Sequence, residues 1–417
     1  LSPSTYTPRQ PGYEPLMIDI EHPFLKPEAL RTQAWYPQGG DPAARAAFEA
    51  RYYRGYAQMY MSAITAARRA GYPQVSIYGW YTVPRTWWGL ERLHPDPTTD
   101  WAWNAYGKDI YPLVDVIHPS VYCFYVAAQN VAYTLANLDL TRGFLDALPQ
   151  RKPMRPYYWL KYHGGGATGI VWWANQPIVD EEVRAMHAMA FFTGIDGIDQ
   201  WDWFSDPRFA GVPDPALDNH LMVGSPFTCA PEGGGTAQAF ARYDVLHVLD
   251  GDQATGETRF QLIVKDRGPG YGVGEGMPVY RMPRDRLRPH LRPWLENAAA
   301  MFEGLALVHP FEYLLSRGTV QVDVSAQEQF AKTLPIVRRV KLGRYHVLIT
   351  YDPNVLYARL KAGEQTGLDA GTDHRLKVNT AMAGKGIVLQ DFAGHRGLTL
   401  RLPADDQVRI VVLRGER

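Results

Sequence analysis

Two acidic residues close the short apolar run that begins at Leu16. Asp19 and Glu21 are two positions apart, and alternate residues of a strand point to the same face, so both carboxyl groups are expected on one side. An acid pair is costly to bury, which indicates a solvated strand end. Two neighbouring carboxyls do not both ionise cheaply, so one keeps a proton near neutral pH and can act as a general acid while the other orients it.

Asp-x-Glu alone is a common pattern, and its ordinary explanation is a strand end whose acids pair with Lys or Arg. Other expected strand ends carry polar-tipped aromatic residues or acids as well: Tyr78 and Trp80, Tyr122 and Tyr125, Tyr158 and Tyr162, and Asp199 with Trp201. A rim of this kind around one acid pair is what an enzyme that cleaves a glycosidic bond needs.

The elements that must position these residues follow a strand-then-helix rhythm between Glu14 and about Phe204. The expected strands are Leu16 to Glu21, Val75 to Tyr81, Val114 to Tyr122, Arg155 to Tyr162 and Gly197 to Trp203. Helical spacing of apolar residues predicts a helix over Pro42 to Ala70, which Gly71 ends. A second helix is expected over Asp180 to Phe192, with acids in its first turn.

This alternation favours an α/β fold, a (β/α) TIM-like barrel with its catalytic groups at the carboxyl ends of the strands. Five strands do not close such a barrel. Either its first strands precede Leu1, or the runs Tyr243 to Leu249 and Phe260 to Lys265 complete it.

The rest of the chain divides into an insertion, a helix and a second domain. Residues 211–282 are rich in Gly and Pro and are interpreted as a turn-rich insertion, and Trp294 to Leu305 is expected to be a helix. From about Val320 alternating strands predict an antiparallel β-sandwich. The expected domains are a barrel over 1–312 and a sandwich over 313–417. The expected sandwich strands are Ile336 to Val340, His346 to Thr350, Arg375 to Val378, Gly386 to Leu389, Leu398 to Leu402 and Val408 to Leu413.

Composition agrees with a carbohydrate groove and excludes several other classes. The 417 residues include 12 Trp, 25 Tyr and 15 Phe, which gather in short clusters suited to stacking on sugar rings. An apolar share of 46% excludes a disordered chain. The 43 basic residues balance the 43 acidic ones, so neither a nucleic acid nor a membrane surface is indicated as partner. The oligomeric state stays open.

Neither a cofactor nor a metal site is indicated by the sequence. Cys123 and Cys229 lack zinc-ligand spacing, and neither a zincin His pair nor a Gly-x-Ser-x-Gly elbow is present. The chain has no apolar run of membrane-spanning length and starts at Leu1 rather than Met. We expect a processed or truncated start and a secreted or periplasmic protein.

The sequence resembles the hyaluronidases of glycoside hydrolase family 56 across about two hundred residues. The matching motifs follow the family's order: Asp19-Ile20-Glu21, the helix Phe48 to Gly71, Ile77-Tyr78-Gly79-Trp80-Tyr81, Pro119-Ser120-Val121-Tyr122, Pro156-Tyr157 with Tyr162, and Gly197-Ile198-Asp199-Gln200-Trp201.

This resemblance implies roles for individual residues. Glu21 corresponds to the general acid/base and Asp19 to its orienting partner. Tyr122 and Tyr162 correspond to hydrogen-bonding groups around the reacting sugar, and Trp201 to a wall of the same subsite. In the family the substrate's own N-acetyl oxygen is the nucleophile, which implies retention of configuration.

Departures from the family pattern leave alternatives open. The family places two strands before its acid pair, whereas here only eighteen residues precede Asp19. Asp199 stands where the family has an apolar residue, and Asp202 follows Trp201. Either could be a second carboxylate for a glycan without an acetamido group. A catalytically silent glycan-binding domain is the third reading.

Overall fold

The structure is a computed structural model of the chain. It describes residues 15–20, 26–39, 41–79, 90, 100–124, 127–163, 177–201, 220–242, 244–252, 256–262, 277–291, 294–359, 387–390, 399–402 and 407–414. The chain forms two compact units, each described here by itself. Unit 1 comprises residues 1–121, 135–158 and 193–199, and unit 2 comprises 122–134, 159–192 and 200–417.

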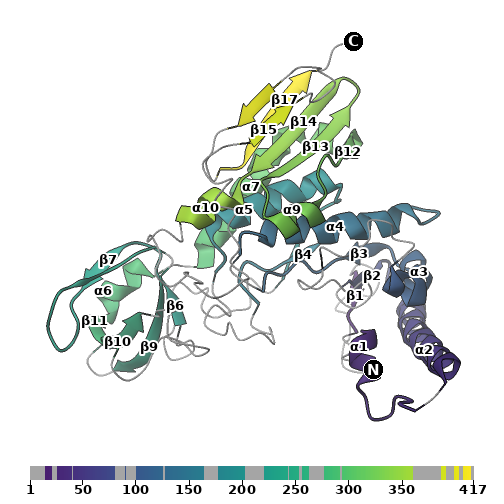
Figure 1. The fold of residues 1–417 in the computed structure, drawn as a ribbon, viewed down its shortest axis with the longest axis horizontal. Helices are drawn as coiled ribbons and strands as arrows, with labels where there is room; N and C mark the ends of the chain where they lie inside the picture. The colour runs from purple at the N-terminus through teal and green to yellow at the C-terminus, as the bar shows by residue number, and fades with distance from the viewer. Residues whose placement is uncertain are drawn as a thin grey trace. The chain divides into compact units, whose positions relative to one another are not determined.

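A parallel sheet lies at the centre of unit 1 (Figure 1). Its strands are β1 (Leu16–Ile18), β2 (Val75–Tyr78) and β3 (Val116–His118), in that order. β1 pairs with β2 and β2 with β3, both in parallel. Val75, Ile77, Val116 and Ile117 are all buried, as expected for a parallel sheet covered on both faces.

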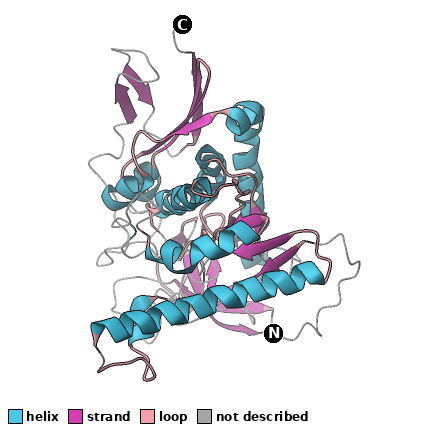
Figure 2. Cartoon of the chain, turned by 90° about the vertical axis from the view of Figure 1, so that its right-hand side faces the viewer, coloured by secondary structure: helices cyan, strands magenta, loops and turns pink. Residues whose placement is uncertain are grey.

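The long helix α2 (Pro42–Arg69) packs against β1 and β2, and in Figure 2 it is the long helix that faces the viewer. Asp41 caps its start by accepting a hydrogen bond from the Ala43 N–H. Gly71 ends it with a φ of 87°, and the Tyr72 N–H reaches back to the Ala67 carbonyl. This left-handed closure confirms the predicted helix and its stop signal.

Shorter helices complete the connections of unit 1. They are α1 (Pro27–Arg31) before α2, then η4 (Trp103–Gly107), α3 (Lys108–Ile110) and η5 (Tyr111–Leu113) between β2 and β3. Helix α4 (Asn130–Asp146), of which residues 135–146 belong to unit 1, follows β3 and was not predicted from the sequence. Its residues are buried on nearly every side, so its sequence has no polar face to reveal the helical period.

The parallel arrangement continues past β3 along the chain. Ile117 bridges to Met154, and Ser120 to Tyr157, both in parallel. β4 (Tyr157–Tyr158) then pairs with β5 (Asp199–Gln200). All five expected strands of the barrel are therefore present in shorter form, while closure of a barrel stays a prediction.

Residues 220–291 form an antiparallel sheet in unit 2, where the sequence analysis expected mainly turns. The strand order is β11 (Tyr280–Pro283), β10 (Glu257–Leu262), β9 (Val245–Asp252) and β6 (His220–Met222). β9 and β10 each have neighbours on both sides within this sheet. The expectation that these two runs complete the parallel barrel is therefore wrong, because their backbone edges are already paired.

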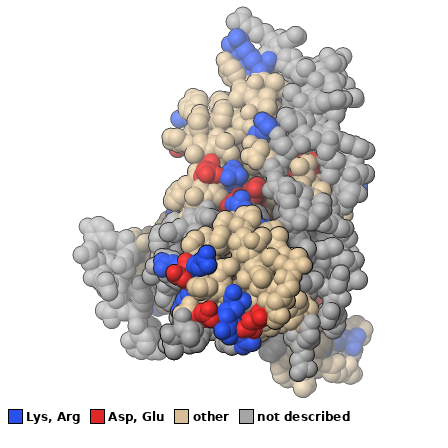
Figure 3. Space-filling view, turned by 90° about the vertical axis from the view of Figure 1, so that its left-hand side faces the viewer, with Lys and Arg blue, Asp and Glu red and all other residues tan. Residues whose placement is uncertain are grey.

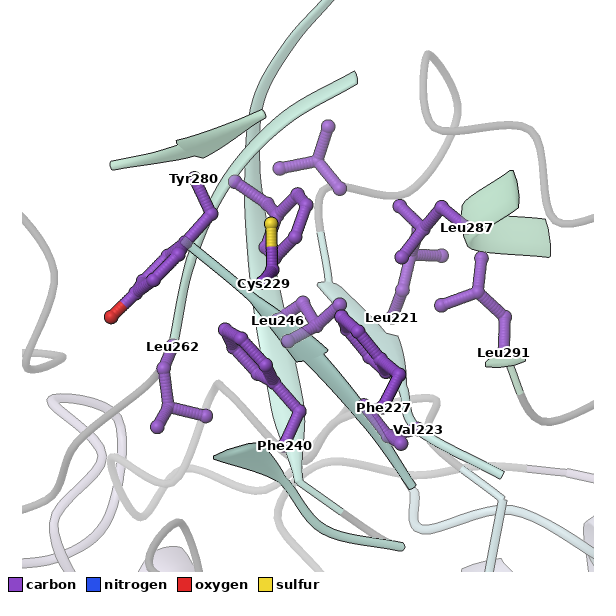
Figure 4. Close-up of a cluster of buried hydrophobic side chains, with 12 residues drawn as sticks. Leu221, Val223, Phe227, Cys229, Phe240, Leu246, Leu262, Tyr280, Leu287 and Leu291 are labelled. Atoms are coloured by element: carbon purple, nitrogen blue, oxygen red, sulfur yellow. The ribbon is translucent and has the colours of Figure 1, made fainter. Parts of the chain in front are cut away.

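This sheet has its own hydrophobic core, drawn in Figure 4, to which the hairpin β7 (Phe227–Cys229) and β8 (Gln238–Phe240) contributes. The Phe227 and Phe240 rings are stacked with centroids 4.6 Å apart, and Phe240 meets Tyr280 edge to face at 5.0 Å. On the outside, Glu232 pairs with Arg259 and Arg281. Figure 3 shows acidic and basic side chains lying next to one another on the face that this sheet presents.

Helices α5 (Asp180–Ala190) and α7 (Trp294–Val308) pack against each other in unit 2 and agree with the two helices expected there. Gly304 permits their close approach, since a Cβ at that position would lie 2.6 Å from the Arg184 carbonyl oxygen. Short helical pieces flank them: η7 (Phe191–Thr193), α6 (Arg284–Leu287), η9 (Arg288–His290), η10 (His309–Phe311) and α8 (Glu312–Arg317).

The carboxyl-terminal part contains a four-stranded antiparallel sheet in the order β12 (Thr319–Gln321), β13 (Ile336–Leu342), β14 (Tyr345–Tyr351) and β17 (Arg409–Arg414). A separate hairpin joins β15 (Ile387–Gln390) and β16 (Thr399–Leu402), and α9 (Ala326–Lys332) and α10 (Pro353–Arg359) are the helices of this part. Five of the expected strands are thus present. Arg375 to Val378 lies outside the described residues, and the sandwich stays a prediction.

Candidate functional site

The carboxyl ends of three parallel strands carry the first group of candidate residues, all in unit 1. Asp19 follows the last residue of β1 and is exposed. Tyr78 and His118 are the last residues of β2 and β3 and are cross-strand partners. Because the strands are parallel, these three residues lie at the same edge of one sheet.

Tyr60 of α2 contacts the backbone beside the acid pair. It is fully buried, and its hydroxyl lies 3.3 Å from the backbone nitrogen of Ile20, the residue between Asp19 and Glu21. The same hydroxyl lies 3.5 Å from the Ile20 carbonyl oxygen, so it can accept from or donate to the strand end. Burial raises the pKa of the neighbouring Tyr56, and the negative charge of Asp19 raises it further, so the Tyr56 hydroxyl stays protonated at neutral pH.

An ion-paired cluster lies beside His118. The Asp199 carboxylate accepts a hydrogen bond from the Arg155 guanidinium at 2.6 Å and lies 2.8 Å from Nδ1 of His118. The same nitrogen is 3.0 Å from the Arg155 carbonyl oxygen. Since both neighbours are acceptors, Nδ1 carries a hydrogen, and the neutral ring then presents Nε2 as its acceptor.

The Tyr157 ring joins these groups to Tyr78. Its centroid lies 5.9 Å from that of Tyr78 and 5.2 Å from that of His118. Burial, with the Asp199 charge, raises the Tyr157 pKa. Gly79 allows the two strand ends to approach, because its N–H donates to the His118 carbonyl at 2.7 Å and a Cβ there would lie 3.1 Å from the Cα of Pro119.

A second group of candidate residues lies in unit 2. The Tyr122 ring is stacked on His163 at 5.7 Å and contacts Trp159 at 5.5 Å. The Lys161 ammonium lies 4.4 Å from the Trp159 ring centre. Burial and the Lys161 charge lower the pKa of His163, so this ring is neutral at pH 7.

Tyr162 belongs to a buried polar cluster around Glu182, also in unit 2. Glu182 accepts hydrogen bonds from the Asn130 amide at 2.5 Å and from the Tyr357 hydroxyl. Tyr162 is 1% exposed, and burial, followed by the charge of Glu182, raises its pKa. Burial raises the pKa of Glu182 to about 8.

The structure divides the sequence-predicted site residues between its units. Unit 1 contains Asp19, Tyr78, Tyr158 and Asp199, and unit 2 contains Tyr122, Tyr162 and Trp201, the last of which is 39% exposed. Glu21, Trp80 and Tyr125, with the alternative nucleophile Asp202, lie outside the described residues.

Sequence reasoning missed three residues of the strand-end cluster. They are His118, Arg155 and Tyr157. Tyr157 was passed over for its neighbour Tyr158, which is fully buried. Adjacent strand residues point to opposite faces, so spacing alone did not decide which tyrosine would meet Tyr78.

Two comparisons with known proteins gave no match: no family model and no curated protein matches the chain. Two solved structures are distantly similar. A crystal structure of bee venom hyaluronidase in complex with a hyaluronic acid tetramer has 19% identity and a TM-score of 0.33, over 44% of this chain and 60% of that chain. A monoclinic crystal structure of the same venom enzyme has 16% identity and a TM-score of 0.31, over 46% and 63%. The chain thus spans less than two thirds of these hyaluronidases.

The described residues contain no group of three or more His, Cys, Asp or Glu side chains arranged to hold a metal ion. None of the helices within them is both long and apolar enough to cross a membrane.

The strand-end residues of unit 1 offer the carboxylate of Asp19, the hydroxyls of Tyr78 and Tyr157, and the His118 ring, which lies 2.8 Å from the Asp199 carboxylate.

Proposed function

We propose that this protein is a glycoside hydrolase that cleaves a polysaccharide, with Glu21 as general acid/base and Asp19 as its orienting partner. The observation that carries the proposal is the gathering of Asp19, Tyr78 and His118 at the carboxyl edge of one parallel sheet. Catalytic groups of barrel enzymes occupy this edge. Trp80, Tyr122, Tyr125 and Trp201 remain sequence-based predictions of substrate contacts, whereas Tyr158 and Tyr162 are at most 1% exposed and are not proposed to touch the substrate.

The proposed nucleophile is an N-acetyl oxygen of the substrate, with retention of configuration. Asp199 is a poor alternative, because its carboxylate is already engaged by Arg155 and His118. A carboxylate that is paired with a guanidinium is a weaker nucleophile than a free one. Hyaluronic acid, the ligand in one similar crystal structure, contains such N-acetyl groups and is the first substrate to try.

Replacing the general acid tests the proposal. Glu21→Gln removes the transferable proton at nearly constant size, and we expect turnover to fall by about two to three orders of magnitude, the contribution of acid–base catalysis. Release of reducing ends from a polysaccharide panel measures it, with circular dichroism as the folding control. Cleavage by the variant at near wild-type rate would falsify the assignment.

The nucleophile is tested separately. We expect retained configuration in the first-formed product, followed by proton NMR, and no cleavage of glycans that lack a 2-acetamido group. Cleavage of such glycans would favour an enzyme carboxylate such as Asp202. Binding without any cleavage by the wild-type chain would favour the silent glycan-binding domain.

A further inference from the structure

A continuous strip of aromatic rings crosses α2 in unit 1, and two of its members are exposed tryptophans. Trp35 is stacked on Tyr52 with centroids 5.8 Å apart, Tyr52 meets Tyr53 at 5.5 Å, and Tyr53 meets Trp101 at 5.6 Å. Trp35 is 50% exposed and Trp101 is 37% exposed, whereas Tyr53, which links Tyr52 to Trp101, is only 5% exposed. We call these four residues the α2 aromatic strip. Two large exposed aromatic side chains joined through supporting rings favour a binding surface.

The charged residues of α2 are mostly basic. Helix α2 carries one acid, Glu49, and five arginines: Arg45, Arg51, Arg54, Arg68 and Arg69. Glu49 forms an ion pair with Arg31 at 2.8 Å, and hydrogen bonding to Arg31, together with the Arg45 charge, keeps the pKa of Glu49 below its ordinary value. Arg45 precedes Tyr52 by seven positions and so lies on the same side of the helix. Beyond the Arg31–Glu49 pair, Arg45 is therefore a positive charge on the side of α2 that contacts Trp35.

We propose that the α2 aromatic strip, with Arg45 at its rim, is a second polysaccharide-binding surface that holds a distant segment of an anionic chain. Flat indole and phenol rings stack on the apolar faces of sugar rings, and guanidinium groups pair with carboxylate or sulfate substituents. The choice of a polysaccharide as ligand rests on the proposed function.

The strip lies within reach of a chain bound at the acid pair. Tyr60 contacts the backbone between Asp19 and Glu21, and Tyr52 precedes it on α2 by eight residues, about 12 Å along a helix axis. A polymer can span that distance, whereas a monosaccharide or disaccharide seated at the strand ends does not. The surface therefore contributes to polymer affinity and leaves substrates of one or two sugar units unaffected.

Aromatic rings among arginines also suit single-stranded nucleic acid, the main competing ligand. The chain as a whole has no net charge, whereas nucleic-acid-binding domains are usually basic. We therefore favour the anionic polysaccharide and include an oligonucleotide as a probe.

Titration calorimetry with the full-length Glu21→Gln chain tests the proposal without cleavage of the ligand. The probes are polymeric hyaluronan, neutral dextran and a thymidine oligonucleotide. Adding Trp35→Ala should weaken hyaluronan binding about tenfold, the value of one aromatic stacking contact, while Trp35→Phe should stay within about threefold because a ring remains. Arg45→Gln should weaken hyaluronan binding and reduce its salt dependence without disturbing the ring contacts.

Tyr313→Ala is the matched control, because Tyr313 is an aromatic residue in unit 2 that is 65% exposed. The hyaluronan affinity of the Tyr313→Ala chain should equal that of the Glu21→Gln chain from which it is made. Equal hyaluronan affinity in the Trp35→Ala and Arg45→Gln chains, or tighter binding of the oligonucleotide than of hyaluronan, overturns the proposal. Trp35-dependent binding by a wild-type chain that cleaves no polysaccharide supports this surface while refuting the proposed hydrolase.

Discussion

At the scale of single residues, Asp199 is the most informative position, because its two possible roles predict different effects of replacing it. As a nucleophile it would be essential for turnover. As the partner of Arg155 and His118 it instead fixes the tautomer and position of a histidine at the strand ends. Its side chain is only 20% exposed, which suits the second role.

We expect Asp199→Asn to destabilise the fold by about 1 to 2 kcal/mol, because the ion pair with Arg155 is replaced by a hydrogen bond from the guanidinium to a neutral amide. Turnover should fall far less than in Glu21→Gln, since the transferable proton is unaffected. Urea unfolding and reducing-end assays measure the two effects. A loss of turnover as deep as that of Glu21→Gln would restore Asp199 as the nucleophile.

At the scale of elements, the close approach of two strand ends depends on Gly79. A Cβ there would meet the Cα of Pro119 at 3.1 Å and the carbonyl oxygen of His118 at 3.2 Å. Both neighbours are backbone atoms, which do not yield as a flexible side chain does. Gly79→Ala should therefore separate the ends of β2 and β3 and lower the free energy of unfolding by about 1 to 3 kcal/mol. Turnover should fall as well, because Tyr78 and His118 move apart.

Gly55 provides the matched control, because it lies within α2 and a Cβ there meets nothing within 4 Å. Gly55→Ala should stabilise the protein by up to about 1 kcal/mol through helix propensity alone. The thermal unfolding midpoints of both variants measure the two effects. If the two substitutions shift the midpoint in the same direction, the close approach at Gly79 is not structurally important.

Elements with a strong local signal were predictable from sequence, and those defined by distant contacts were not. The periodic apolar face of α2 and its closing Gly71 fixed both ends of that helix. In contrast, the strands of the 220–291 sheet are mostly three to eight residues long and separated by Gly and Pro, so their pairing is visible only in three dimensions. The Asp199–Arg155 pair spans 44 positions, and no spacing rule connects them.

At the scale of the whole molecule, two buried titratable groups of α5 should shape the pH dependence of stability. Burial raises the pKa of Glu182 to about 8 and lowers that of His187 to about 4. In the unfolded chain the ordinary values are about 4.3 and 6.5. Both side chains are thus neutral in the folded protein near pH 6, whereas both are charged in the unfolded chain.

The two groups act in opposite directions. Below about pH 4.3, Glu182 makes its full contribution to the free energy of unfolding. This contribution is lost as the pH rises towards 8, by about 1.4 kcal/mol per pH unit. His187 favours folding above about pH 6.5, and its contribution is lost as the pH falls towards 4. The slopes cancel between about pH 4.3 and 6.5, so a net decline should appear only from about pH 6.5 to 8.

Glu182→Gln separates these contributions, because the amide is neutral at every pH and retains most of the contacts with Asn130 and Tyr357. The urea midpoint of this variant should stay flat from pH 6.5 to 8, where that of the wild type falls, and it should decline below pH 6.5 because only His187 then responds. Subtracting the two free energies of unfolding at each pH removes the groups that both chains share. A difference that does not change with pH would mean that Glu182 is ionised in the folded protein, and its hydrogen bond from Tyr357 would then join a phenol to a carboxylate rather than to a carboxylic acid.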